Sequence, residues 1–428
     1  MRTFKGGTTW VLVLLAVPIA AAQSPEERTR QALETVLAGK CEVFYAQWSP
    51  EMKKAMTLQT YAAQVSQIVA ALGQPQSQEP PQARHVGDAV AVTIPVHWPA
   101  ATLNFIVSWN AAGQIQGTWF RQPEPKPAPY ETPSYSHPDS FSEREISLGA
   151  DPWKLPGTLT VPNGKGPWPG VVLVHGSGPN DRDESVGGVR VFRDLAEGLA
   201  TRGIAVLRYD KRTKIYPQSA ADPAFTMTRE TADDAVLAAA LLRKQDGIDA
   251  RHVFVLGHSQ GGYMMPRIMQ ADPTLAGVIV MAGSVRPLPE LIVEQSEYLA
   301  SLIDELTPAE QAQLASIRRD PWVIAPGVTE KYKADLKGYD PTALAASSPI
   351  PMLILQGERD YQVRMKDFDL WKTGLAHKHN VTLRSYPKLN HLFVAGEGKS
   401  TPDEYAKPGH VSPEAIGDIA DWIRSETK

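Results

Sequence analysis

The 428-residue sequence contains a single cysteine, Cys41, so it can form no internal disulfide bond. It also lacks basic runs with interleaved aromatic residues, and together with a net charge of −4 this argues against nucleic acid as a partner. Its apolar run over Trp10–Ile19 is too short to span a bilayer. What remains is a composition of 43% hydrophobic and 21% charged residues, which indicates a globular chain of two or three units.

The first residues predict a secretory signal peptide over 1–22. Arg2 and Lys5 precede the apolar run, and Ala20-Ala21-Ala22 supplies small residues for cleavage. We expect cleavage after Ala22, which leaves an exported protein, periplasmic or secreted, with a net charge of −6 and no integral membrane span. The alternative is an uncleaved membrane anchor.

Residues 23–122 predict a small α+β domain. Apolar residues at three- and four-residue spacing favour helices over Pro25–Leu37 and Met52–Leu72. Strands are expected over residues 89–96, 101–109 and 114–120, and Trp98, Trp109 and Trp119 are expected in the core of this sheet rather than on a binding surface. The prolines across 123–140 predict a semi-rigid linker.

From residue 141 to 428, short apolar runs alternate with helical segments. Because the runs show no polar alternation, we expect strands covered on both faces, and hence a mostly parallel sheet. The alternation breaks over residues 285–348, which predicts a helical lid over the carboxyl edge of the sheet. Strands are expected over 141–147, 155–161, 170–174, 204–207, 253–256, 275–281, 351–356 and 381–386, and helices over 189–201, 228–244 and 413–425.

One stretch organises this second domain. Residues 253–262 read VFVLGHSQGG, which predicts a strand, a tight turn and a helix. A serine at such a turn has a strained backbone and a hydroxyl that projects from the sheet edge, and the flanking glycines let strand and helix pass closely. The alternative is a glycine-rich turn after a buried strand. Partners that appear downstream favour a nucleophile at Ser259.

Five motifs together resemble the α/β-hydrolase fold, and within it exported bacterial carboxylesterases related to the dienelactone-hydrolase branch. The small domain is loosely similar to the helix-then-sheet domain that precedes the hydrolase in some of these esterases. RYDKR lacks the glycine that we expect after it in the resembling proteins. The motifs are HGSGPNDRDE (175–184), RYDKR (208–212), GHSQGG (257–262), LILQGERDYQV (353–363) and LNHLF (389–393).

The resemblance implies the order nucleophile, acid, base, which Ser259, Asp360 and His391 satisfy. A serine hydroxyl is a poor nucleophile until a base takes its proton, and a carboxylate must hold that base in the right tautomer. Glu358 is the rival acid, but it comes too soon after its strand. His377 and His379 precede the last strand, and their H-x-H spacing has no third metal ligand nearby, so no cofactor or metal is expected. His410 lies near the terminal helix.

Backbone N–H groups should receive the negative charge that forms on the ester oxygen. We expect these donors to be the N–H of Gln260 and of Ser177, with His175, Gly176 and His258 as supporting residues. Charged residues near the same edge are expected to form an ion-pair network that fixes loops rather than to contact substrate. They are Asp181, Arg182, Asp183, Arg208, Asp210 and Arg212.

The resulting hypothesis is an exported serine carboxylesterase that acts on a small-molecule ester through an acyl-enzyme. A serine peptidase of the prolyl-oligopeptidase kind would share the triad but usually brings a propeller, and no blade-like repeat precedes this domain. A thioesterase or lactonase is a further alternative. A ligand-binding protein with an inert hydrolase fold is the non-enzymatic one. The sequence does not indicate an oligomeric state.

Overall fold

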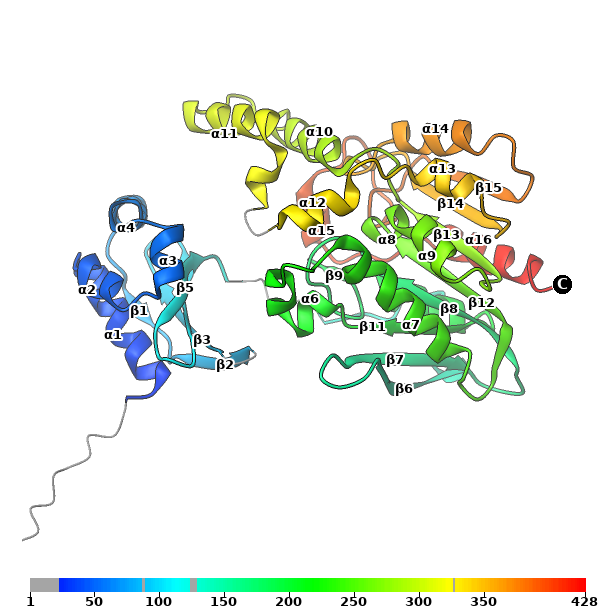
Figure 1. The fold of residues 1–428 in the computed structure, drawn as a ribbon, viewed down its shortest axis with the longest axis horizontal. Helices are drawn as coiled ribbons and strands as arrows, with labels where there is room; N and C mark the ends of the chain where they lie inside the picture. The colour runs from blue at the N-terminus through cyan, green and yellow to red at the C-terminus, as the bar shows by residue number, and fades with distance from the viewer. Residues whose placement is uncertain (1–22, 87–88, 124–128, 326–327) are drawn as a thin grey trace, which may run out of the picture. The chain divides into compact units, whose positions relative to one another are not determined.

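A computed structural model describes residues 23–86, 89–123, 129–325 and 328–428. The chain forms two compact units, Met1–Glu124 and Pro125–Lys428, each of which is described by itself (Figure 1). The predicted signal peptide over 1–22 lies outside the described residues.

The first unit packs four helices against an antiparallel sheet. Within the range 52–72, where one helical pattern was expected, the chain forms two helices, because the Thr57 side chain accepts a hydrogen bond from the Thr60 N–H and starts a new helix. The helices are α1 (Pro25–Leu37), α2 (Cys41–Ala46), α3 (Pro50–Ala55) and α4 (Leu58–Leu72). The strands are β1 (Ser77–Gln78), β2 (Gln82–Val86), β3 (Ala89–His97), β4 (Thr102–Trp109) and β5 (Ile115–Arg121), in the order β1-β3-β4-β5 with β2 also paired to β3.

This unit has a core of its own, built on aromatic side chains such as Phe44, Trp48 and Phe105. Trp98 and Trp109 are buried as expected, whereas Trp119 is 43% exposed. A cavity of about 660 Å³ lies between α4 and β5, and all of its lining residues belong to this unit.

The second unit contains an eight-stranded sheet in the order β15-β14-β13-β12-β8-β11-β7-β6. The six strands from β15 to β11 are parallel, and β7 and β6 are added antiparallel at one edge. The prediction of an α/β-hydrolase fold is confirmed. The strands are β6 (Phe141–Leu148), β7 (Leu155–Pro162), β8 (Trp168–Val174), β11 (Ala205–Tyr209), β12 (Ile248–His258), β13 (Gly277–Met281), β14 (Met352–Gly357) and β15 (Val381–Tyr386).

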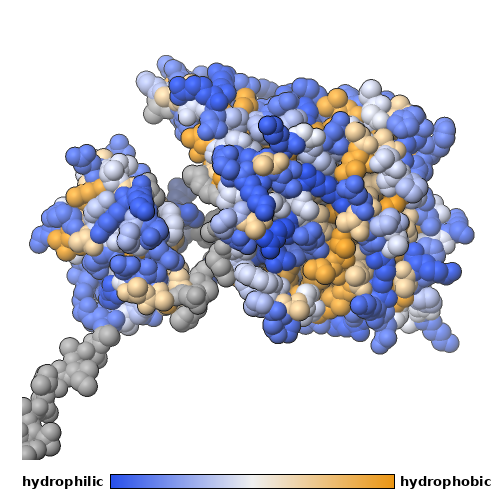
Figure 2. Space-filling view, viewed as in Figure 1, coloured by the Kyte–Doolittle hydropathy of each residue, from blue (hydrophilic) through white to orange (hydrophobic). Residues whose placement is uncertain are grey.

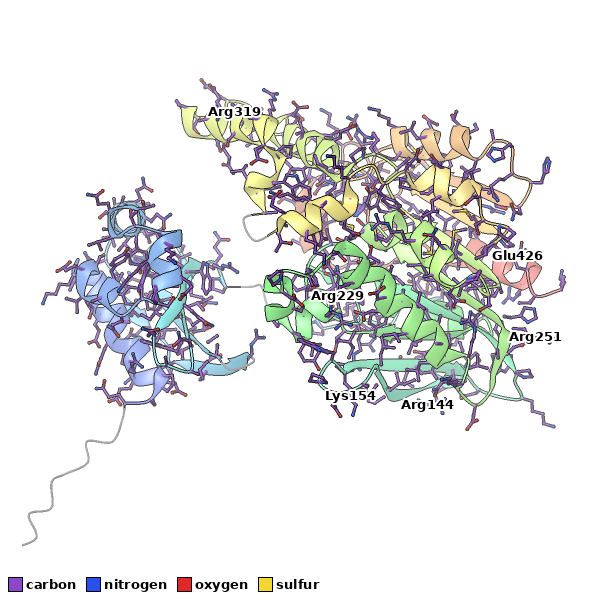
Figure 3. All side chains as sticks on the ribbon, viewed as in Figure 1. Arg144, Lys154, Arg229, Arg251, Arg319 and Glu426 are labelled. Atoms are coloured by element: carbon purple, nitrogen blue, oxygen red, sulfur yellow. The ribbon has the colours of Figure 1, made fainter. Side chains whose placement is uncertain are left out.

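Helices cover both faces of this sheet (Figure 1). Successive side chains of β8 point to opposite faces of the sheet and pack in two different hydrophobic cores. Val172 and Val174 belong to the core on one face, and Val171 and Leu173 to the core on the other. The first face is covered by α7 (Asp233–Leu242), α9 (Met265–Ala271), α13 (Pro341–Ala346) and α14 (Met365–Gly374), and the second by α5 (Val191–Ala200) and α16 (Pro413–Ser425). Charged side chains such as Arg144 and Arg251 lie on the outside of the second unit (Figure 3). The visible face of each unit is mainly hydrophilic, with some apolar areas (Figure 2).

A helical excursion joins β13 to β14, in the range expected for a lid. It contains α10 (Leu288–Ala300), α11 (Pro308–Arg319) and α12 (Glu330–Leu336) before α13. The excursion begins at a buried anchor, where Asp367 of α14 accepts hydrogen bonds from the N–H groups of Val285 and Arg286 and from the Arg286 guanidinium. In the described ranges, no helix is both long and apolar enough to cross a membrane.

The expected linker covers residues 123–140, and the second half of it is hydrogen-bonded to α5. The Tyr130 hydroxyl donates to the Asp194 carboxylate at 2.8 Å, and the Ser136 hydroxyl donates to the Glu197 carboxylate at 2.8 Å. Both carboxylates are buried, which explains why this segment is held against the unit rather than extended in solvent.

Candidate active site

The residues expected to act together all follow carboxyl ends of parallel strands, which meet at one edge of the sheet. Ser259 follows β12, Asp360 follows β14 and His391 follows β15, while the loop over 175–178 follows β8. Because β8, β12, β13, β14 and β15 are neighbours in that sheet, the four loops converge on the same edge.

Ser259 sits at the sharp turn between β12 and the short helix α8 (Gln260–Tyr263), with φ 51° and ψ −112°. A positive φ is strained for a residue with a side chain, and the surrounding structure must impose it. A Cβ added to Gly261 would lie 2.2 Å from the Val174 carbonyl oxygen, and one on Gly257 would lie 2.3 Å from the Gly261 carbonyl carbon. The two glycines therefore allow the strand and the helix to approach as closely as this turn requires.

His391 is held by Asp360. The Nδ1 atom of His391 is 2.7 Å from Asp360 Oδ2, and both side chains are buried. Asp360 is itself fixed, because its Oδ1 accepts the N–H groups of Gln362 at 2.7 Å and Val363 at 2.9 Å. Glu358, the rival acid, is exposed and accepts a hydrogen bond from Ser385 instead.

The loop after β8 lies directly against the serine. A Cβ on Gly176 would be 3.2 Å from the Ser259 Cβ. The Gly176 N–H is already used, since it donates to Glu184 Oε1 at 2.6 Å, whereas within the described residues the Ser177 N–H has no acceptor. On the other side, Gln260 is the first residue of α8, so its N–H has no partner within that helix. Among the described residues, neither of the two expected donors therefore has an acceptor for its N–H group.

His258 and Glu184 form a buried ion pair next to this site. The Nδ1 of His258 is 3.0 Å from Glu184 Oε2, and the His258 Nε2–H donates to the His391 carbonyl oxygen at 3.0 Å. Burial alone would lower the pKa of His258, but the Glu184 carboxylate outweighs it and raises that pKa. Burial alone would raise the pKa of Glu184, but the positive charge of His258 holds it below its ordinary value. Both shifts favour the charged pair.

His175 has a different role from His258. Burial lowers the pKa of His175 to about 4, so its ring is neutral near neutral pH. Its Nε2–H donates to the Asp181 carbonyl oxygen at 3.0 Å, and its ring packs edge-on against Tyr209. His175 therefore braces the loop that carries Gly176 and Ser177.

The charged residues of the HGSGPNDRDE and RYDKR motifs make ion pairs within the unit. Arg182 pairs with Asp210 and Glu145, and Arg208 pairs with Asp183 and Glu143. Arg212 pairs with Asp234 of α7 and so attaches this network to the rest of the unit, whereas Asp181 accepts the Ser185 N–H within its own loop. These contacts fix the loops beside the serine.

The remaining histidines lie elsewhere. His377 and His379 are exposed in the loop before β15, and His410 pairs with Asp194 near α5. Throughout the described ranges, no three His, Cys, Asp or Glu side chains are grouped as metal ligands.

Three buried charged residues beside the site are not predicted by the sequence patterns. Glu184 and Lys211 lie in the HGSGPNDRDE and RYDKR motifs, but nothing in these motifs specifies which loop their side chains contact. Glu230 lies in no recognised motif. It stands on a π-helical turn, Thr228–Ala232, within the range expected to be one regular helix.

Comparisons with known proteins place the chain among hydrolases. The Hydrolase_4 family model, described as serine aminopeptidase, S33, matches residues 170–397. Esterase EstD of Thermotoga maritima is 40% identical over 328 residues, which cover 75% of this chain and 76% of EstD. Among solved structures, the Pyrococcus furiosus esterase Pf2001 has a TM-score of 0.46 at 17% identity, covering 70% of this chain and 97% of that one. Est1E from Butyrivibrio proteoclasticus has a TM-score of 0.44 at 16% identity, covering 66% and 98%.

The family match begins inside β8 and ends after the His391 loop, so it contains each loop that meets at the sheet edge. The expected resemblance to α/β-hydrolase serine esterases, and with it a hydrolytic enzyme, is confirmed. On the match over 170–397 and the 40% identity to a relative across most of both chains, this protein belongs to the Hydrolase_4 family of α/β-hydrolases.

Proposed function

We propose that the protein hydrolyses carboxylic esters through an acyl-enzyme on Ser259, with His391 as the general base and Asp360 as the carboxylate that orients it. One observation carries the proposal: the 2.7 Å contact between His391 Nδ1 and Asp360 Oδ2, on a loop that His258 ties to the nucleophile's turn. With Nδ1 engaged, the Nε2 atom of His391 is the one left to take the serine proton.

The reaction then has two halves. As the Ser259 Oγ forms a bond to the ester carbon, His391 takes the hydroxyl proton, and the carbonyl oxygen becomes an oxyanion that the Gln260 and Ser177 N–H groups stabilise. When this intermediate collapses, the bond to the alcohol oxygen breaks and His391 returns the proton to the leaving alcohol. A water molecule, deprotonated by His391, attacks the acyl group in the same way and releases the acid and free Ser259.

The choice of esters over peptides rests on the carboxylates around the nucleophile. The family description names an aminopeptidase, whose substrate carries an α-ammonium group that an acid without another partner could hold. Here Glu184 pairs with His258, Glu230 with Lys211, and Asp360 contacts His391. The name of the relative EstD, an esterase, supports the same choice.

The test measures how fast the full-length protein turns over substrates that differ in their leaving group. We expect turnover of p-nitrophenyl esters and of alkyl esters with varied acyl length, little or none of aminoacyl p-nitroanilides, and loss of all turnover in Ser259→Ala. Faster cleavage of the anilides would favour the peptidase. A protein that turns over no ester, thioester or lactone, and that a fluorophosphonate probe does not label, would be an inert fold with a binding role.

We also propose that the protein is exported, because residues 1–22 have the three regions of a secretory signal. Cell fractionation with N-terminal sequencing tests this. A mature chain that begins at Gln23 outside the cytoplasm is expected, and an intact Met1 in the membrane fraction would support the anchor instead.

A further inference from the structure

Lys211 is a buried cation that contacts the loop beside the nucleophile. Its side chain is 2% exposed, and its Nζ donates to the Gly176 carbonyl oxygen at 2.7 Å. Asn180 Nδ2 donates to the same oxygen at 3.2 Å. A buried ammonium that is directed at one backbone carbonyl fixes the orientation of that peptide group.

The orientation matters because the Gly176 carbonyl and the Ser177 N–H belong to one peptide unit. In a planar trans peptide the C=O and N–H bonds point in opposite directions. A donor that holds the Gly176 oxygen therefore directs the Ser177 N–H to the opposite side. The Gly176 Cα lies beside the Ser259 Cβ, so this peptide adjoins the place where the ester oxygen becomes charged.

Glu230 neutralises Lys211 and reaches the second oxyanion donor residue. Its Oε1 is 3.0 Å from Lys211 Nζ, and its Oε2 accepts the Gln260 Nε2–H at 3.1 Å. Thr231, the next residue on the same π-helical turn, accepts from the same Gln260 amide at 2.9 Å. One buried ion pair therefore contacts the carbonyl of the peptide that carries the Ser177 N–H and the side chain of Gln260, the residues whose N–H groups face the ester oxygen in the proposed mechanism.

The helical excursion joins the same carboxylate. Tyr332 lies on α12 and is 8% exposed, and its hydroxyl donates to Glu230 Oε2 at 2.8 Å. Burial first, and then the Glu230 charge, raise the pKa of Tyr332, so this hydroxyl keeps its proton and acts as a donor. A movement of α12 away from the unit would remove one of the donors to Glu230.

We propose that Lys211 and Glu230 are positioning residues of the oxyanion hole. Through its hydrogen bond to Glu230, Tyr332 couples the position of α12 to that hole. The proposal rests on the proposed function, because it assigns these residues to the ester reaction. Neither charged side chain is placed to touch the reacting atoms. They act through the peptide of Gly176 and the side chain of Gln260, so their removal should weaken transition-state binding more than ground-state binding.

The decisive variant is Lys211→Met/Glu230→Gln, which removes both charges together and leaves no unpaired buried ion. We expect kcat for a p-nitrophenyl ester to fall by about 10- to 100-fold with KM changed less than about twofold. The affinity for an alkyl boronic acid, which forms a tetrahedral adduct on serine, should fall in parallel. The affinity for the product alcohol of an alkyl ester, which carries no anionic oxygen, should stay constant.

A second pair of variants keeps the proposal testable if the double variant does not fold. Tyr332→Phe removes only the hydroxyl that bonds Glu230, and Tyr339→Phe is its matched control, because the Tyr339 hydroxyl donates to the Tyr263 carbonyl at 2.9 Å. Both variants should unfold at similar temperatures. Tyr332→Phe should lose kcat and boronic acid affinity relative to Tyr339→Phe.

Three results would overturn the inference. They are equal kcat in the two tyrosine variants, a double variant with wild-type kcat and boronic acid affinity, or a double variant in which product and boronic acid affinities fall together. Ser259→Ala separates this failure from failure of the proposed function. If Ser259→Ala is inactive while the positioning variants behave like wild type, only the inference is wrong, and if Ser259→Ala keeps its turnover, the proposed function itself is wrong.

Discussion

Glu184 and His258 lie 3.0 Å apart as an ion pair, with side chains 2% and 3% exposed. Glu184 also accepts the Gly176 N–H, and His258 donates to the His391 carbonyl oxygen. The pair therefore ties together the loop after β8, the nucleophile's turn and the loop of the proposed base. Glu184 has φ 46°, so its backbone is strained at the point where the three loops meet.

This pair predicts a pH window of stability. Glu184 has a lowered pKa, so its contribution is present above its ordinary value of 4.5 and is lost as pH falls through the lowered value. His258 has a raised pKa, so its contribution is present below its ordinary value of 6.5 and is lost as pH rises through the raised value. The stability contributed by the pair should be greatest between these two ordinary values.

The control is Glu184→Gln/His258→Gln, which keeps neutral hydrogen-bonding groups. Urea unfolding of wild type and variant across pH should give a free-energy difference that declines on both sides of the window. A difference that is constant with pH would show that the pair is not charged in the folded protein.

Asp360→Asn should lower kcat by about three to four orders of magnitude, because an amide in place of the carboxylate favours the wrong histidine tautomer. Glu358→Gln is the matched control, since Glu358 is exposed and contacts Ser385 rather than His391. Steady-state kinetics of both variants show which of the two carboxylates orients His391. Similar losses in the two would mean that the acid has been assigned to the wrong residue.

Gly176→Ala should reduce kcat while the protein still folds. The new Cβ would lie 3.2 Å from both the Ser259 Cβ and Glu184 Oε1, so the loop that carries Gly176 and Ser177 must shift by a few tenths of an ångström. Gly417→Ala in α16 is the control, because an added Cβ there meets nothing within 4 Å and should stabilise the helix by about 0.5 to 1 kcal/mol. Wild-type kcat in Gly176→Ala would show that the loop tolerates displacement.

Truncation should distinguish the two halves of the 123–140 segment. A chain that begins at Pro129 keeps the Tyr130 and Ser136 contacts and should fold and turn over small esters, because the second unit has cores of its own on both faces of its sheet. A chain that begins at Phe141 leaves Asp194 and Glu197 buried without these donors and should melt at a lower temperature. Equal melting temperatures would mean that the contacts with α5 contribute no stability.

Much of this arrangement could be predicted because it is coded locally. The helix over Pro413–Ser425 begins where the Ser412 side chain caps it, and the strand over Val381–Tyr386 is a short run that contains β-branched and aromatic residues. Ser259, Asp360 and His391 each follow a strand, and the parallel order of these strands brings them to one edge. Local patterns therefore predict the strands and the turns after them, whereas the order nucleophile, acid and base comes from the family resemblance.

The supporting charges could not be predicted in the same way. The contact of Glu184 with His258 depends on a positive φ in a loop that no residue pattern specifies. Glu230 faces Lys211 from a π-helical turn, whereas a regular helix across 228–244 would present a different set of side chains to the nucleophile's turn. Both pairs are set by tertiary packing between distant segments.

The most direct test of the central claim is to trap the acyl-enzyme. The full chain is mixed with a p-nitrophenyl ester, quenched with acid within milliseconds and analysed by intact mass spectrometry and peptide mapping. We predict a burst of p-nitrophenol that is stoichiometric with enzyme, and a mass increase of one acyl group on the peptide that contains Ser259. Turnover without any adduct, or an adduct on another residue, would contradict the account.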